Sequence, residues 1–232
     1  MNSDRRKPRR NRLHGLEILF EDRDLIVICK KPGLLTNSPH RDQTRTAERF
    51  LTSYLRKGNP RSRLRAYTVH RLDRDTSGLL VFAKSERVQQ QLKNNWRDVD
   101  KTYYAVVHGH LKKTKGSIIN YLAENKAQVV YVTPNQSLGK RAETHYQEVG
   151  RSTRCTALHV DLVTGRKNQI RVHFAHLGHP IVGDPKYGEK GDKFRRMALH
   201  AMDLSFDHPF SGRRMIFHAP VPPELLKLTA KK

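Results

Sequence analysis

The stretch VHRLDRDTSGLLVFAKS (residues 69–85) sets a histidine and four charged side chains, HRLDRD, just before the apolar run GLLVFA. The apolar run reads as a buried strand, and AYTV before it reads as a second strand-like segment. Residues 70–78 are therefore expected to form a loop between strands, which is a usual place for reactive groups.

Two interpretations of Asp73 and Asp75 follow from this loop. In the first, which is the commoner one for such a loop, both carboxylates accept backbone hydrogen bonds in a turn and pair with arginine. In the second, one carboxylate is a nucleophile or a base that a nearby guanidinium keeps ionised. The local sequence does not choose between them.

The charge of the chain indicates a polyanionic partner. Its 232 residues hold 45 Lys and Arg against 22 Asp and Glu, for a formal net charge of +23 and a pI near 10.4. No segment approaches the ~20 apolar residues of a membrane span, and the N-terminus lacks a signal-peptide pattern. Nucleic acid is therefore favoured over a membrane. Cys29 and Cys155 have no cysteine neighbours, which predicts buried thiols in a reducing cytosol.

The hydrophobic pattern predicts a strand-rich α+β fold. Residues 1–15 are expected to be a disordered basic arm, and residues 16–232 one domain. Apolar spacing of three and four predicts helices within 44–57, 85–98 and 168–178, with Ser85 as an N-cap and Gly178 at a C-terminus. Strand patterns occupy 16–30, 101–109, 127–133, 142–149, 156–163, 196–206 and 213–220.

Two further stretches could carry chemistry. In TGRKNQIRVHFAHLGHPIVGDPKYG (164–188), Arg166 and Arg171 flank the start of a predicted helix, where they could bind phosphate or pair with a loop carboxylate. His173, His176 and His179 have no ligand partners among them and are expected to lie at the surface or face RNA rather than bind metal. In KTYYAVVHG (101–109), Tyr103 and Tyr104 should point to opposite faces of a strand, one into the core and one free to stack on a base.

Together these stretches resemble the RluA-type pseudouridine synthases. The matching segments, in order, are KKPGLLT (30–36), HRLDRDTSGLLVFAKS (70–85), KTYYAVVHG (101–109), the 164–188 stretch and ALHAMDLSFDHPF (198–210). The resemblance implies a pseudouridine synthase fold, with a mixed, mostly antiparallel central sheet and peripheral helices. It also implies a cytoplasmic, monomeric enzyme that isomerises uridines in structured RNA, with 23S rRNA preferred over tRNA, and that needs no cofactor and no metal.

The resemblance also assigns roles to residues. Asp73 would be the catalytic aspartate, Arg171 its salt-bridge partner, and Tyr103 the ring that stacks on the target base and assists deprotonation at C5. Asp75 falls at a position that the family does not require and is given a turn role. The expected RNA contacts are Arg71, which would fill the gap left by the flipped nucleotide, Ile170, which would support the base, and His70, Arg166 and Lys31.

Two departures from the family pattern bear on these roles. Asn168 stands where histidine is common. Only about 15 residues precede the domain, so a member without the S4-type RNA-binding domain that many relatives carry is expected. Attack at C1′ and deprotonation at C2′ both remain open as the first step. Two alternatives remain as well: a non-catalytic RNA-binding or ribosome-assembly protein of the same fold, and a glycosidase-like or nuclease activity that uses Asp73 and Asp75 as a pair.

Overall fold

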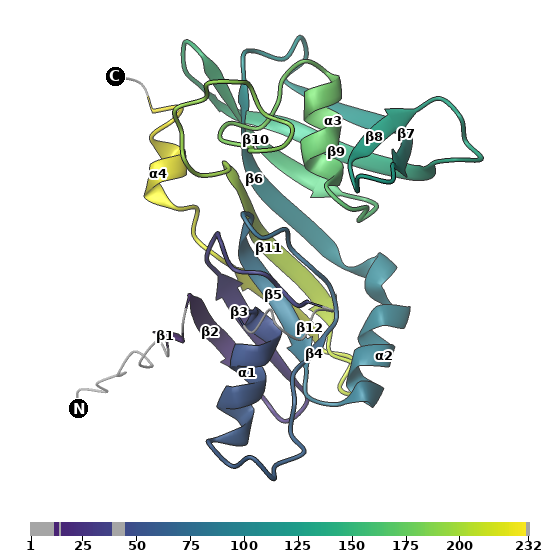
Figure 1. Cartoon of the computed structure of the whole chain (residues 1–232), viewed down its shortest axis with the longest axis vertical. Coiled ribbons are helices and arrows are strands. Elements are labelled where there is room, and N and C mark those ends of the chain that lie inside the picture. Colours follow the sequence, from purple (N-terminus) through teal and green to yellow (C-terminus); the bar gives the residue numbers. More distant parts are fainter. Residues whose placement is uncertain (1–11, 14, 39–44, 231–232) are drawn as a thin grey trace.

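A computed structural model of the chain describes residues 12–13, 15–38 and 45–230, which form one twelve-stranded sheet and its helices (Figure 1). The strand order is β1-β2-β3-β5-β11-β6-β10-β9-β7-β8, with β4 paired to β5 and β12 paired to β11. Among these strands, only the β5–β11 pairing is parallel. The predicted mixed, mostly antiparallel sheet is confirmed.

The elements have the following bounds. The helices are α1 (Ala47–Arg56), α2 (Glu86–Asn94), α3 (Gln169–His176), α4 (Pro223–Leu226) and the 3-10 turn η1 (Trp96–Asp98). The strands are β1 (Arg12–Leu13), β2 (Leu16–Glu21), β3 (Leu25–Lys30), β4 (Tyr67–Thr68), β5 (Ser77–Ala83), β6 (Asp100–His108), β7 (Lys115–Glu124), β8 (Val130–Thr133), β9 (Lys140–Arg151), β10 (Cys155–Leu162), β11 (Leu199–Asp207) and β12 (Arg214–His218).

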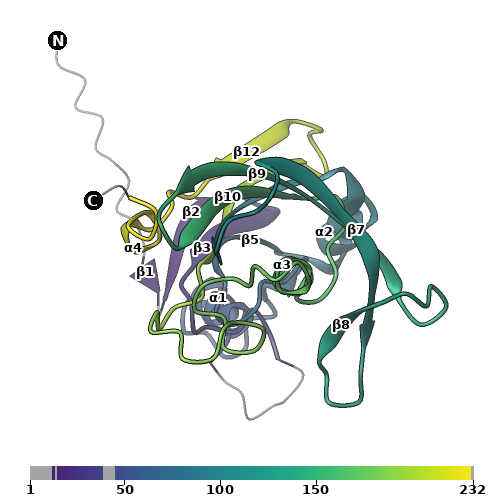
Figure 2. The ribbon, with the colours of Figure 1, turned by 90° about the horizontal axis from the view of Figure 1, so that it is seen from above.

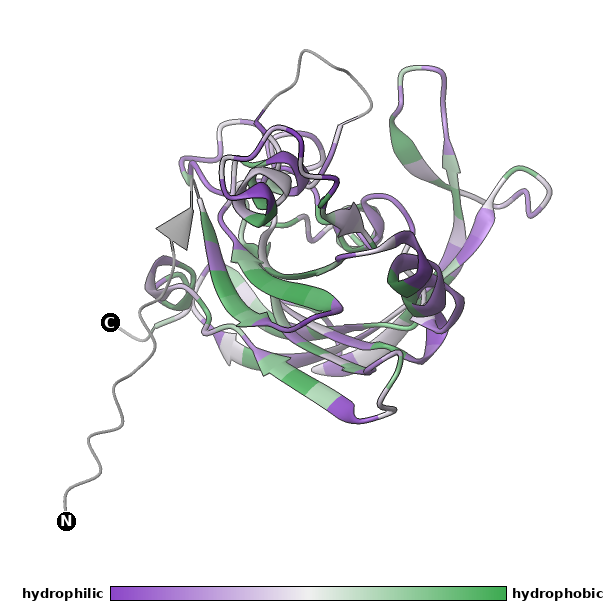
Figure 3. Ribbon diagram, turned by 90° about the horizontal axis from the view of Figure 1, so that it is seen from below, coloured by the Kyte–Doolittle hydropathy of each residue, from purple (hydrophilic) through white to green (hydrophobic). Residues whose placement is uncertain are grey.

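Strand β5, the apolar run of the 69–85 stretch, is buried along its whole length between β3 and β11. Leu80 and Phe82 on one face pack in a core cluster with α1, while Leu79 and Val81 on the other face pack in a cluster with α2. Burial on both faces explains why this strand reads as a continuous apolar run rather than an alternating one. Figure 2 shows the sheet as a curved wall with α1 and α3 on its concave side, and in Figure 3 the hydrophobic ribbon is concentrated in the strands. The strand that precedes β5 in the chain, β4, has only two residues.

The helix boundaries follow from capping side chains. Thr46 accepts a hydrogen bond from the Arg49 N–H at the start of α1, and Ser85, the predicted N-cap, accepts one from the Val88 N–H at the start of α2. Gly178 has a φ of +79° just after α3, which ends that helix as predicted.

The predictions missed β7 and the short strand β1. Strand β7 pairs with both β8 and β9, yet its burial does not alternate strictly, so it lacks a strand signature. Arg12 and Leu13 pair with β2, so the predicted arm of residues 1–15 overlaps the sheet. The rest of that prediction, residues 1–11, lies outside the described residues. No helix in the described ranges is long and apolar enough to cross a membrane.

The expectation that His173 lies at the surface or faces RNA is wrong. Its side chain is fully buried on α3, and neither ring nitrogen has a hydrogen-bond partner among the described residues. Burial, and secondarily the nearby charge of His176, lowers the pKa of His173 to about 4. The sequence missed this because α3 is packed on most of its circumference, and a three-residue histidine repeat does not show which members face the core.

Acid should destabilise the protein through its buried histidines. Burial is the main cause that lowers the pKa of His70 to about 3 and of His173 and His200 to about 4, below the ~6.5 of an unfolded chain. As the pH falls below 6.5, the unfolded state takes up these protons first, so the free energy of unfolding should fall by up to about 1.4 kcal/mol per pH unit for each histidine. Urea unfolding between pH 7 and 4.5 measures the change in the free energy of unfolding with pH. In the His173→Leu variant this change should be smaller by the contribution of one histidine. A pH-independent free energy of unfolding would contradict the prediction.

Candidate active site

One pocket brings together the predicted site residues. It has a volume of about 910 Å³ and lies where the β4–β5 loop, β6, the start of α3 and the start of β11 meet. Seven of the eight residues to which the sequence analysis assigned a catalytic or RNA-binding role line this pocket. They are Asp73, Arg171, Tyr103, Arg71, His70, Ile170 and Arg166. Lys31 is exposed and does not line this pocket, so the structure separates it from the group.

The loop that carries Asp73 is fixed by hydrogen bonds from a second loop, at residues 33–36. Thr36 donates through its hydroxyl to the Leu72 carbonyl at 2.9 Å and accepts from the Leu72 N–H at 3.1 Å. The Gly33 N–H donates to the Arg74 carbonyl at 2.9 Å. These contacts hold the backbone on both sides of Asp73, which pre-organises its carboxylate.

The Asp73 carboxylate is held through one oxygen only. Arg171 Nη1 and Asn168 Nδ2 both donate to Asp73 Oδ2 at 2.7 Å. No donor among the described residues reaches Oδ1, and the side chain is 30% exposed. Oδ1 therefore faces the pocket without a donor from the described residues, while Oδ2 is held by the guanidinium and the amide.

Arg171 is itself clamped by a second aspartate that sequence reasoning missed. Its Nε and Nη2 donate to the two oxygens of Asp184 at 2.7 and 2.8 Å, and Asp184 is fully buried. Burial opposes the charged form of each partner, but the ion pair outweighs it, so the pKa of Asp184 is lowered and the pKa of Arg171 is raised. Because Asp184 fixes the orientation of the guanidinium through Nε and Nη2, the remaining nitrogen, Nη1, points toward Asp73. The GDPKYG segment was the available signal, since an aspartate in an otherwise turn-like loop is a candidate partner for Arg171.

Asn168 is the other residue whose contact the sequence left undefined. It has a φ of 54°, a left-handed conformation that asparagine tolerates, and this turns its amide toward Asp73. Its Oδ1 accepts from the Tyr187 hydroxyl at 3.3 Å, and that hydroxyl accepts from the Val130 N–H at 3.0 Å. The Tyr187 hydroxyl thus orients the Asn168 amide, and the amide gives Asp73 an uncharged hydrogen-bond donor.

Tyr103 and Ile170 form an apolar part of the pocket beside Asp73. Both are nearly buried, with 8% and 4% of their surface exposed. Burial, with the charge of Asp73 in support, raises the pKa of Tyr103, so the phenol is neutral over the physiological range. A neutral ring is suited to stacking on a base, and this favours stacking over the predicted role in deprotonation.

The two aspartates of the loop are placed differently. Asp75 does not line the pocket and pairs with its neighbour Arg74 at 3.3 Å. A carboxylate-pair glycosidase or nuclease needs both groups in one site. The arrangement gives this alternative no support.

Lys30, next to the exposed Lys31, is fully buried below the two loops. Its ammonium donates to the carbonyls of Lys31, Leu34 and Arg74 at 3.1, 2.8 and 2.9 Å. Burial lowers its pKa to about 7, and Asp75 and Asp73 partly offset this effect. Lys30 thus joins the loop at residues 31–34 to the loop that carries Asp73.

Replacing Lys30 with methionine should loosen that junction. The variant keeps the apolar stem but leaves buried carbonyls unpaired, so the free energy of unfolding should drop by about 3 kcal/mol. The rate of the reaction at saturating RNA should fall more than the affinity for RNA, because Asp73 loses its fixed position. Urea unfolding and steady-state kinetics measure the two effects. Wild-type values for both would show that Lys30 does not support the site.

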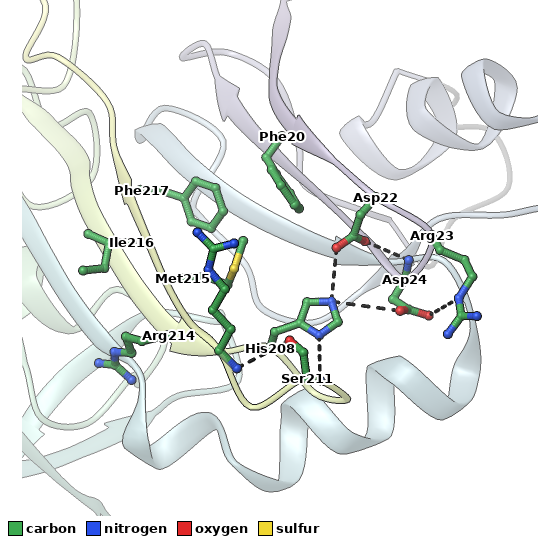
Figure 4. A pocket seen from close by; sticks show the side chains of 11 residues that line it. Phe20, Asp22, Arg23, Asp24, His208, Ser211, Arg214, Met215, Ile216 and Phe217 are labelled. Carbon is green, nitrogen blue, oxygen red and sulfur yellow. Dashed lines mark hydrogen bonds and ion pairs between the residues drawn. The ribbon is translucent and has the colours of Figure 1, made fainter.

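A second pocket, with a volume of about 520 Å³, contains Asp22, Asp24 and His208 with side-chain ligand atoms within 4.8 Å of one another (Figure 4). The Phe210 and Ser211 N–H groups both point to His208 Nδ1 at 3.3 Å, so the ring proton sits on Nε2 and is donated to Asp22 at 3.1 Å. Neither ring nitrogen then has a free lone pair for a metal ion. The cluster is a hydrogen-bonded clamp between the β2–β3 and β11–β12 turns.

Comparisons with known proteins agree with one another. Residues 24–176 match the protein family described as RNA pseudouridylate synthase. The chain is 36% identical over 217 residues to the uncharacterized RNA pseudouridine synthase YlyB of Bacillus subtilis (strain 168), covering 92% of this chain and 71% of that protein. It is 36% identical over 230 residues to the ribosomal large subunit pseudouridine synthase D of Escherichia coli (strain K12), covering 92% and 69%.

Solved structures show the same fold. The human RNA pseudouridylate synthase domain containing 1 superposes with a TM-score of 0.73 at 26% identity, over 93% of this chain and 88% of that one. The human RNA pseudouridylate synthase domain containing 4 superposes with a TM-score of 0.72 at 21% identity, over 90% of each chain.

Proposed function

Since this chain belongs to the RNA pseudouridylate synthase family and is an RNA pseudouridine synthase, we propose that Asp73 is the carboxylate that performs its chemistry. The observation that carries the proposal is the asymmetric binding of this group. Two donors hold Oδ2 at 2.7 Å, and Oδ1 has no protein donor among the described residues. A nucleophile or base needs one oxygen fixed for orientation and one free to react.

The isomerisation breaks the N1–C1′ bond of uridine and forms a C5–C1′ bond. The free Asp73 oxygen either attacks C1′, and is released again when C1′ bonds to C5, or removes the C2′ proton and later returns it. C5 then loses its proton to solvent and N1 takes one up, so the product is an isomer of uridine. Atoms and electrons balance without a donor, so the reaction needs no cofactor. Arg171 orients Asp73 through a hydrogen bond to Oδ2, and Asp184 keeps Arg171 in place.

The substrate must leave its stack to reach this pocket. A uridine inside a helix is inaccessible, so the enzyme acts on a flipped or loop nucleotide, at a cost of a few kcal/mol. Tyr103 and Ile170 would stack on and support the base. Arg71 lines the pocket and has no ion-pair partner within the described part of the chain, which suits it to replace the extruded base or bind phosphate. Arg166, at the rim, would contact the RNA backbone.

We place the substrate in large-subunit ribosomal RNA rather than tRNA. The support is the name of similar proteins in Escherichia coli and Vibrio cholerae, ribosomal large subunit pseudouridine synthase D. The enzyme would work in the cytoplasm and as a monomer.

The test is tritium release from RNA labelled at uridine C5. The labelled RNA is extracted from cells of the source organism that lack the gene, so that its target uridines are unmodified. We expect the purified protein to release tritium from the large ribosomal RNA fraction and not from the tRNA fraction. Release only from tRNA would overturn the substrate proposal, and binding without release from any fraction would favour the non-catalytic alternative.

A further inference from the structure

One wall of the pocket has no part in the chemistry proposed for Asp73. It consists of Trp96 from η1, His70 from the β4–β5 loop and Lys101 from β6, all of which line the pocket. The Trp96 and His70 rings are stacked with centroids 4.5 Å apart and an angle of 29°, and the Lys101 ammonium lies 5.9 Å from the Trp96 centroid. Lys101 precedes Tyr103 by two residues on one face of a strand, a rise of about 6.6 Å. The wall therefore adjoins the expected place of the target base.

Lys101 presents a cation that has no carboxylate partner in the described part of the chain. No ion pair or hydrogen bond of its ammonium occurs within the described ranges, although the side chain is partly buried. Burial lowers the pKa of Lys101, and Asp100 partly offsets this through its charge. An ammonium that is partly withdrawn from water is stabilised by an anion, and the anion that RNA offers is phosphate.

His70 presents a hydrogen-bond donor. Its Nε2 accepts from the Val81 N–H at 3.1 Å, and burial together with Lys101 lowers its pKa to about 3, so the ring is neutral. The single ring proton then sits on Nδ1, which has no acceptor among the residues that the structure describes. His70 lines the pocket, so its Nδ1–H can serve as a donor to a ligand there.

Trp96 presents an aromatic surface between these two groups. It is partly buried against the α2 cluster and partly exposed in the pocket. Aromatic rings flanked by cations are the usual platform for single-stranded bases.

We propose that this wall binds the nucleotide next to the target uridine: its base packs against the part of the stacked Trp96–His70 pair that faces the pocket, where His70 Nδ1–H can donate to it, and Lys101 pairs with its phosphate. The inference deepens the proposed function, because it supplies a sequence-context subsite to the same reaction. The subsite gives the enzyme a preference for the nucleotide next to the target uridine, in addition to the uridine itself.

Kinetics of matched variants test the subsite with the C5-labelled RNA described above. Loss of a stacked base should raise KM of Trp96→Leu by about 5- to 100-fold, with a smaller change in kcat, and Trp96→Phe should recover most of the loss because it keeps a ring. Lys101→Met should raise KM and reduce the slope of log affinity against log salt by about one unit. Unchanged KM in Trp96→Leu, or equal damage in Trp96→Phe and Trp96→Leu, would overturn the proposal, since the latter indicates packing alone.

Fluorescence gives a readout that is independent of turnover and of variants at Trp96, which is the only tryptophan of the chain. The probe is a nine-nucleotide single-stranded RNA with one central uridine, added to the Asp73→Asn protein, with saturation followed by calorimetry. We expect quenching that is lost when the two flanking nucleotides are abasic. Equal quenching by both RNAs, or none from an RNA that calorimetry shows to be bound, would overturn the subsite. If the wild-type protein releases no tritium at all, the proposed function has failed instead.

Discussion

Asp73→Asn is expected to lower kcat for tritium release by at least about 10³-fold, the scale on which removal of a catalytic nucleophile acts. The amide has the size of the carboxylate and can still accept hydrogen bonds at Oδ1, so the loop should keep its shape. It has no negative charge and no reactive oxygen, so neither attack at C1′ nor deprotonation at C2′ can proceed. Arg171 remains paired with Asp184 in this variant, which is why the protein should still fold and bind RNA.

The matched control for this prediction is Asp75→Asn. Asp75 is two residues away, lies outside the pocket and pairs only with Arg74 among the described residues. Its activity should stay close to that of the wild type, because exposed pairs contribute little to stability. Equal losses in Asp73→Asn and Asp75→Asn would instead point to a pair of carboxylates acting together.

Arg171→Met is expected to have the largest effect on stability, lowering the free energy of unfolding by about 3–5 kcal/mol at neutral pH. The methionine removes the only guanidinium that contacts the Asp184 carboxylate in the described chain, and Asp184 is fully buried. In the wild type, the lowered pKa of Asp184 contributes stability above its unfolded value of about 3.9 and loses it as pH falls through the folded value. In the variant that contribution is absent, so the deficit should shrink in acid. Urea unfolding at pH 7 and at pH 3, below the unfolded value, measures both effects.

A double variant separates the structural and catalytic roles of Arg171. Arg171→Met/Asp184→Asn leaves no buried unpaired charge, so it should recover part of the lost stability. Activity should not return, because Asp73 still lacks the guanidinium that donates to Oδ2 and orients the carboxylate. An Arg171→Met protein as stable as the wild type would contradict the buried pair, and a fully active double variant would contradict the role of Arg171 toward Asp73.

The sequence predicted those parts of the fold that short-range patterns encode. The apolar run at 79–83 identified β5, and Ser85 identified the start of α2, because burial and capping act over a few residues. Strand β7 was missed because its stability comes from two neighbouring strands rather than from its own pattern. Which of Lys30 and Lys31 is buried also depends on the fold, since only packing places the Lys30 ammonium among three carbonyls.

The site was predictable in part for the same reason. Asp73 and Arg171 are 98 residues apart, and the local sequence did not decide whether Arg171 binds phosphate or forms a salt bridge. The resemblance named the pair, and the structure contains the contact. Three further contacts depend on how α3, η1 and the following turns pack, and this packing cannot be read from the spacing of motifs. They are the contacts of Asp184 with Arg171, of Asn168 with Asp73 and of Trp96 with His70.

The most direct test of the central claim is a map of pseudouridines in cellular RNA. RNA is compared from cells that lack the gene and from the same cells supplied with either the wild-type chain or Asp73→Asn. The account predicts that at least one pseudouridine in large-subunit ribosomal RNA disappears with the gene, returns with the wild-type chain and does not return with Asp73→Asn. An unchanged map in cells without the gene, or full restoration by Asp73→Asn, would contradict it.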